Sequence, residues 1–174
     1  MAIGNVRLAL ANLHQPWSAQ TQQKMFALYG GGAFTPEGRA AIGKALADTL
    51  RGLEYTASVG GANLRIYDFA RDRPGGNREG AVAGKSDRGG VDFSTGYVRD
   101  SNDTVLAHLM THELSHVYAN THDNWYLDGN FNRKPTYQAG GTVQDVPAAP
   151  FTFDNAVHNA ATVENCVPVL ANGR

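Results

Sequence analysis

The sequence lacks several features that would indicate whole classes of protein. Cys166 is its one cysteine, so no disulfide can form within the chain and folding needs no oxidising compartment. No apolar run approaches the roughly 18 residues that span a bilayer. The 15 basic and 16 acidic residues nearly cancel and form no long run of one charge. We therefore expect neither a nucleic acid nor a membrane as partner.

Length and the N-terminus set the remaining bounds. The 174 residues fit one domain, 1–174, large enough to bury a core without disulfides. The first residues lack the charged, apolar and small-residue order of a signal peptide, so we expect a soluble chain. Its localisation stays open, with export by a non-classical route and delivery as an effector as the two alternatives. Cys166 lies among valines, which predicts a buried structural thiol rather than a nucleophile.

The first third of the chain has the pattern of helices. An apolar run over 6–13 stops before Pro16, and Ser18 can cap a helix that the glycines at 30–32 end. Thr35, followed by Pro36 and Glu37, is a typical helix start, and its apolar stripe is predicted to end at Gly52.

The rest of the chain alternates between strand and loop patterns. Short strands are predicted at 55–59, 64–69, 91–94 and 96–98, in a small mixed or antiparallel sheet. Residues 91–94 and 96–98 come just before the HExxH stretch, and an exposed edge there could hold an extended peptide beside the site. Turn compositions mark 74–76 and 84–90, and a long loop is predicted at 127–152. A last helix is predicted at 153–167, capped by Thr152 or Asp154.

The stretch from His112 to His116 carries the strongest chemical signal, an HExxH pattern. Ser101, Asn102 and Asp103 offer helix caps, and no proline or glycine follows until Tyr118. On a helix the two histidines lie one turn apart on one face, as two ligands of a Zn²⁺ ion require. Glu113 then lies beside the metal, where it can take a proton from the water that the metal activates.

The sequence pattern alone does not identify the third zinc ligand. A catalytic zinc usually has three protein ligands, and the candidates after His116 are His122, Asp123, Asp128, Asp145, Asp154, His158 and Glu164. His122 has the spacing of a metzincin ligand, but the glycine that would turn the chain back is absent.

Residues 112–126 resemble the aspzincin metallopeptidases, the deuterolysin and peptidyl-lysine endopeptidase group. In that family HExxH is followed by a GTxDxxYG-like segment, which Asn120 to Leu127 matches except at its two glycines. The likeness covers about the C-terminal half and extends weakly to 156–164. It implies Asp123 as third zinc ligand and Tyr126 as the phenol that steadies the oxyanion. Asn120 tolerates the left-handed backbone of the first glycine, whereas Leu127 is a harder replacement.

Lysine-preferring members of the family bind lysine with acidic side chains on their last helix. This chain keeps Glu164 there but has Ala161 at the other acidic position, so the resemblance implies at most a weakened preference for lysine after the cut. Glu164 is the candidate substrate-binding residue. His108, one turn before His112, is a candidate partner of the ligands.

Together these patterns predict an α+β, zincin-like domain with N-terminal helices, a small sheet, an HExxH helix and a C-terminal helix. The expected function is a zinc metalloendopeptidase acting on protein or peptide substrates. One rival is a bacterial toxin that cuts cell-wall peptides or a target-cell protein, with a cognate inhibitor or immunity protein as partner. The other is an inactive, metal-stabilised binding domain, against which the intact Glu113 argues.

Overall fold

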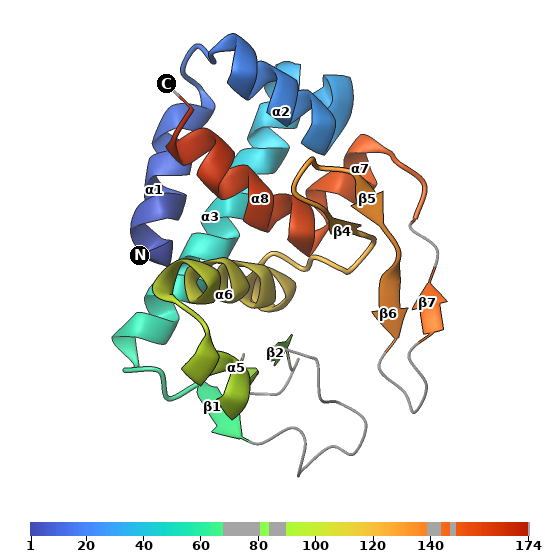
Figure 1. The fold of residues 1–174 in the computed structure, drawn as a ribbon. Coiled ribbons are helices and arrows are strands. Elements are labelled where there is room, and N and C mark those ends of the chain that lie inside the picture. Colours follow the sequence, from blue (N-terminus) through green and yellow to red (C-terminus); the bar gives the residue numbers. More distant parts are fainter. Residues whose placement is uncertain (68–80, 84–89, 139–143, 147–148, 174) are drawn as a thin grey trace.

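Helices from both ends of the chain form one packed layer in the computed structural model, which describes residues 1–67, 81–83, 90–138, 144–146 and 149–173 (Figure 1). Helix α8 packs against α1 and α2, and α3 packs against α1. The bounds are α1 Ala2–Leu13, α2 Ala19–Tyr29, α3 Pro36–Ser58 and α8 Ala160–Ala171. Fully buried Leu13, Met25, Ile42, Leu46 and Leu170 fill the space between them. Burial of these apolar side chains is the main stabilising term of the layer.

The predicted starts of α2 and α3 are confirmed. The Ser18 hydroxyl accepts the backbone N–H of Thr21 at 3.2 Å, and the Thr35 hydroxyl accepts that of Gly38 at 3.0 Å. The glycines after α2 form a 3₁₀ turn, η1 Gly30–Phe34, that leads directly into α3. Side-chain capping is a local effect, which is why the sequence was sufficient to predict it.

The predicted end of α3 at Gly52 and the strand at 55–59 are wrong. The helix runs on to Ser58, because Leu53 and Thr56 continue the buried stripe. Glycine at position 52 leaves room for a neighbouring side chain and does not end the helix. A Cβ at this position would collide with the ring of Tyr118. The helix ends before Gly60 and Gly61, both of which have positive φ.

The sheet next to the helices is mixed and has three strands in the order β1-β3-β2. Strand β3 pairs in parallel with β1 and antiparallel with β2. The bounds are β1 Leu64–Tyr67, β2 Ala81–Ala83 and β3 Val91–Ser94. The Arg65 guanidinium joins β1 to β3 through two hydrogen bonds to the Asp92 carboxylate, at 2.7 and 2.8 Å. The strands at 64–69 and 91–94 are thus confirmed as far as the described residues reach.

Two further predictions about this sheet are wrong. Residues 91–94 form the central strand rather than an exposed edge, and β2 is the edge strand that lies against the HExxH helix. Residues 96–98 belong to a short helix, α5 Thr95–Asp100. The ladder ends where Ser94 lies opposite Tyr67, so these residues have no strand partner among the described residues.

The HExxH helix, α6 Asp103–Tyr118, lies between the helical layer and the sheet (Figure 1). It packs against α3 and α8 on one side and against β2 on the other. Helices on one side of a small mixed sheet place the fold in the α+β class, as predicted. No helix in the described part of the chain has both the length and the apolar character that a bilayer crossing requires.

The predicted loop at 127–152 contains short paired strands instead. These are β4 Tyr126–Leu127 with β5 Arg133–Lys134, and β6 Thr136–Gln138 with β7 Gln144–Val146. The Asp128 carboxylate accepts the backbone N–H groups of Asn130 and Asn132, which closes the turn between β4 and β5. The predicted turn at 74–76, residues 84–89 of the predicted turn at 84–90, and residues 139–143 and 147–148 of the predicted loop lie outside the described residues.

The predicted last helix is two helices. The first is α7 Phe153–Val157, capped by the Thr152 hydroxyl as expected, and the second is α8. The chain leaves the helical path at His158 and Asn159 because the buried Asn159 side chain binds the segment after α6. Cys166, on α8, is fully buried, and burial raises the pKa of its thiol to about 12, as expected for a structural cysteine.

Candidate metal centre

Helix α6 presents His108, His112 and His116 one turn apart on one face. Its start is fixed by Asn102, whose side-chain oxygen accepts the Val105 N–H at 3.0 Å. His112 is buried and the His116 side chain is 16% exposed, because this face of α6 packs toward α8 and the segment that follows α6. The helix thus holds both imidazoles of the pattern in fixed positions near the surface.

A tight turn after α6 brings the chain back to these imidazoles. Asn120 has φ +53°, the left-handed conformation that the resemblance assigns to a glycine. Beyond it the buried hydroxyls of Thr121 and Ser115 lie 2.7 Å apart in a hydrogen bond. This pair ties the returning chain to α6, so Asp123 lies beside the helix.

Asn159 holds the other side of this segment. Its side chain is fully buried, and its oxygen accepts the backbone N–H groups of Asn124 at 2.9 Å and Trp125 at 3.2 Å. Its amide nitrogen donates to the Thr162 hydroxyl at 2.9 Å. The two backbone amides that follow Asp123 are thus anchored to the start of α8, which limits the positions that Asp123 can adopt.

The ligand atoms of His112, His116 and Asp123 form a nearly equilateral triangle. The two Nε2 atoms are 3.3 Å apart, and Oδ1 of Asp123 lies 3.2 Å from Nε2 of His112 and 3.5 Å from that of His116. Three ligands at about 2.05 Å from one ion, at tetrahedral angles, lie about 3.3 Å apart. The three residues therefore fit around one zinc-sized ion, and they can hold a metal.

Hydrogen bonds on the far side of each ring set its orientation. Nδ1 of His116 is 2.9 Å from the Thr121 carbonyl oxygen, and Nδ1 of His112 is 3.1 Å from Oε2 of Glu164. Both partners are acceptors, so each neutral ring carries its proton on Nδ1. Each Nε2 then directs its lone pair into the triangle, as metal binding requires.

The charged groups of the cluster shift the pKa values of His112 and Asp123. Burial lowers the pKa of His112, but hydrogen bonds to Asp123 and Glu164 outweigh it and raise that pKa to about 10. Burial raises the pKa of Asp123, but His112 and His116 hold it well below its ordinary value. A divalent cation that binds here therefore has to displace a proton from His112.

Glu164 binds two histidines at once, which the sequence alone did not indicate. Its second oxygen, Oε1, lies 3.4 Å from Nδ1 of His108. Burial raises the pKa of Glu164, and the hydrogen bonds from His108 and His112 outweigh this and lower it. These contacts make Glu164 a positioning residue for His112, and they support the predicted link between His108 and the ligands. Its predicted role in binding a substrate lysine is untested.

The two predicted catalytic side chains lie near the triangle. Glu113 is buried, and its charge contributes to the raised pKa of His112. The ring of Tyr126 stacks against that of His112, with centroids 6.3 Å apart and an interplanar angle of 17°. Both residues belong to the immediate surroundings of the ligands.

The other candidate ligands have different positions. Among the residues whose side chains are described, only His112, His116 and Asp123 form a group of three that can hold an ion. His122 is exposed and pairs through its backbone with His158 and Ala160. Asp128 binds Asn132 and Lys134, and Asp154 lies 3.4 Å from His158. The side chain of Asp145 lies outside the described part of the chain.

Sequence reasoning missed the residues that position Asp123, chiefly Thr121 and Asn159. An asparagine directly before the apolar run of α8 has the typical pattern of a helix start, and this was the available signal for a special position at 159. Which backbone groups its side chain would bind depends on the tertiary fold.

Comparisons with protein-family models, with curated proteins and with solved structures find no match to this chain. The resemblance to the aspzincins therefore stays a prediction based on the residues of the 112–127 segment. What can be stated of the site is its geometry, a His-His-Asp triangle with His112 buried and Asp123 exposed, beside a glutamate and a tyrosine.

Proposed function

We propose that this chain is a zinc-dependent endopeptidase with a zincin-like fold. The observation that supports the proposal most is the triangle of His112, His116 and Asp123, whose edges of 3.2 to 3.5 Å match the spacing of three tetrahedral zinc ligands. Two imidazoles and one carboxylate are the three-ligand set typical of a catalytic zinc, whereas a structural zinc usually has four protein ligands.

The residues around the triangle supply the acid–base chemistry in this proposal. His112, His116 and Asp123 would hold the zinc ion, which would act as a Lewis acid and lower the pKa of a water to about 7. Glu113, next to His112 on the helix, would accept a proton from the water whose oxygen adds to the peptide carbonyl carbon. It would then deliver that proton to the amine that leaves as the C–N bond breaks. Burial of the Glu113 side chain keeps bulk water from competing for that proton.

Two other elements have roles in binding the peptide. The Tyr126 hydroxyl donates a hydrogen bond to the scissile carbonyl oxygen as negative charge develops on it. Strand β2 is the edge of its sheet and lies against α6, so an extended substrate that pairs with β2 passes close to the ligands. The strand edge that we propose to pair with substrate is therefore β2, residues 81–83, in place of residues 91–94.

The test is a digest of a mixed proteome by the zinc-loaded chain and by Glu113→Gln, with new termini mapped by mass spectrometry. We expect cleavage by the wild type and a loss of at least about 1000-fold in the variant, because the carboxamide cannot accept the proton. The variant should still bind one equivalent of zinc. Zinc binding without cleavage by either form would refute the peptidase and favour a metal-stabilised binding domain.

A further inference from the structure

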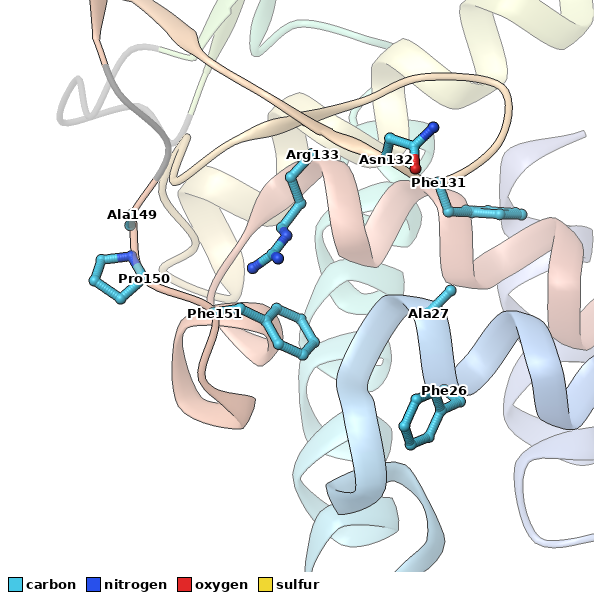
Figure 2. A pocket seen from close by; sticks show the side chains of 8 residues that line it. All are labelled: Phe26, Ala27, Phe131, Asn132, Arg133, Ala149, Pro150 and Phe151. Atoms are coloured by element: carbon cyan, nitrogen blue, oxygen red, sulfur yellow. The ribbon is translucent and has the colours of Figure 1, made fainter.

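A groove of about 680 Å³ lies apart from the metal centre, between α2, the β4–β5 hairpin and the segment that leads into α7 (Figure 2). None of the three ligands lines it. Its walls are Phe26 from α2, Phe131 and Arg133 from the hairpin, and Pro150 with Phe151 from the segment before α7. Its volume is in the range of sites that hold small ligands or short peptide segments.

The groove exposes aromatic rings that a folded chain usually buries. The side chain of Phe26 is 60% exposed and that of Phe151 is 38% exposed. Phe34, 41% exposed, extends the surface, since its ring centroid lies 6.5 Å from that of Phe26. Grouped exposed aromatics combined with arginine are typical of the centre of a protein-binding surface.

Arg133 is the charged group of this surface. Its guanidinium lies 4.4 Å from the centre of the Phe151 ring (Figure 2). It lies 5.8 Å from the centre of the Trp125 ring. The neighbouring Lys134 has its charge matched by Asp128 at 3.2 Å. Arg133 has no ion pair with any described carboxylate, and the described residues that line the groove include no acidic one. The packed rings thus hold a planar donor group in place for an incoming carboxylate.

We propose that the groove binds an extended peptide segment of a partner protein, with an apolar side chain against Phe26 and Phe131 and an adjacent carboxylate on Arg133. A second copy of the chain is a poorer match. In a twofold dimer the same patch faces itself, so it would have to supply the acid for its own arginine. Where the structure describes the lining side chains, none of them is acidic. The inference is independent of peptidase activity, because it uses no residue of the metal centre.

Fluorescence anisotropy with two labelled peptides tests this. The first is Gly-Ser-Phe-Asp-Phe-Ser-Gly and the second has Asn in place of Asp. Both are titrated with the Glu113→Gln protein, so that cleavage cannot interfere. We expect the Asp peptide to bind about tenfold more tightly than the Asn peptide, because only its carboxylate pairs with Arg133.

Variants assign the effect to the groove. In the same background Arg133→Gln should abolish the preference for Asp, and Phe26→Ser should weaken both peptides by about tenfold. Arg51→Gln and Tyr55→Ser are matched controls, since both side chains are exposed on α3 outside the groove. Thermal melts check that each variant folds.

Three outcomes would overturn the proposal. The first is no saturable binding of either peptide up to about 1 mM. The second is a preference for Asp that persists in Arg133→Gln. The third is dimerisation of the chain that Phe26→Ser removes, which would place a second copy in the groove. None of these outcomes bears on the digest that tests the peptidase.

Discussion

The segment 122–125 supplies a ligand to the metal centre and packs against the aromatic groove, and different kinds of contact hold the two regions. Asp123 faces the metal centre, where buried polar contacts of Asn159 and Thr121 fix the backbone. Two residues later the Trp125 ring is buried and packs against Phe151 of the groove, with centroids 5.9 Å apart. The metal centre depends on atoms with directional partners, whereas the groove depends on exposed rings in apolar contact.

Because their contacts differ, the metal centre and the groove should respond differently to substitutions. Removal of one partner in a buried polar network leaves the other unsatisfied, which affects both chemistry and stability. Removal of an exposed ring changes what the surface can bind and little else. Changes in the metal centre should therefore alter metal affinity and folding together, and changes in the groove should leave both intact.

The largest expected effect is the loss of one imidazole from the triangle. His116→Ala should lower zinc affinity by at least about 1000-fold, because two ligands cannot hold the ion against water. Competition with a chromogenic chelator measures this. His122→Ala, an exposed histidine six residues on, is the control and should bind as the wild type does. Equal losses in the two variants would show that the triangle is not the zinc site.

A smaller effect is expected behind His112. Glu164→Gln should weaken zinc binding by about 10- to 100-fold, because the carboxylate that orients His112 becomes a weaker acceptor. His108→Gln should also weaken zinc binding, by a smaller factor. Glu37→Gln, exposed in the first turn of α3, is the control. If Glu164→Gln kept full affinity and changed only the preference for lysine, Glu164 would be a substrate residue as the resemblance implies.

The charge network predicts how stability depends on pH when a chelator removes metals. The folded pKa of His112, about 10, lies above its unfolded value near 6.5. The protonated folded form is thus favoured fully below pH 6.5, and this stabilisation is lost as the pH rises toward 10. The unfolding free energy should fall across this window by a few kcal/mol, as an order of magnitude.

Urea titrations at several pH values measure this dependence. Phe26→Ser should show the same pH dependence as the wild type, because the groove contains none of these charges. His112→Gln should abolish most of it. A wild-type stability that is flat from pH 6.5 to 10 would contradict the network.

The smallest effect is expected at the turn after α6. Asn120→Gly should change the unfolding free energy by less than about 1 kcal/mol, since glycine adopts the left-handed backbone freely. Asn120→Val should cost more than about 1 kcal/mol, because a branched side chain is strained there. Denaturant unfolding compares the two. If both variants were equally stable, the turn would not need its left-handed residue.

The sequence predicted those features that depend on neighbouring residues. The caps at Ser18 and Thr35, and Asn102 as one of three candidate caps, follow from patterns within a few residues, as does the one-turn spacing of His112 and His116. Its choice of Asp123 came from a resemblance to a motif, and the fold does bring that carboxylate to both imidazoles.

The features that it missed depend on contacts between distant segments. Gly52 looks like a helix end until Tyr118, 66 positions later, packs on it. The predicted continuous last helix breaks because Asn159 binds backbone groups at 124 and 125. The link between Glu164 and His112 likewise joins α8 to α6. Spacing along the chain carries no information about such partners.

X-ray absorption at the zinc edge tests the central claim most directly, on the chain loaded with one equivalent of zinc. We predict nitrogen and oxygen ligands at about 2.0 to 2.1 Å with the scattering pattern of two imidazoles, a pattern that His116→Ala should lose. A sulfur ligand, or a spectrum that His116→Ala leaves unchanged, would contradict zinc binding by His112, His116 and Asp123.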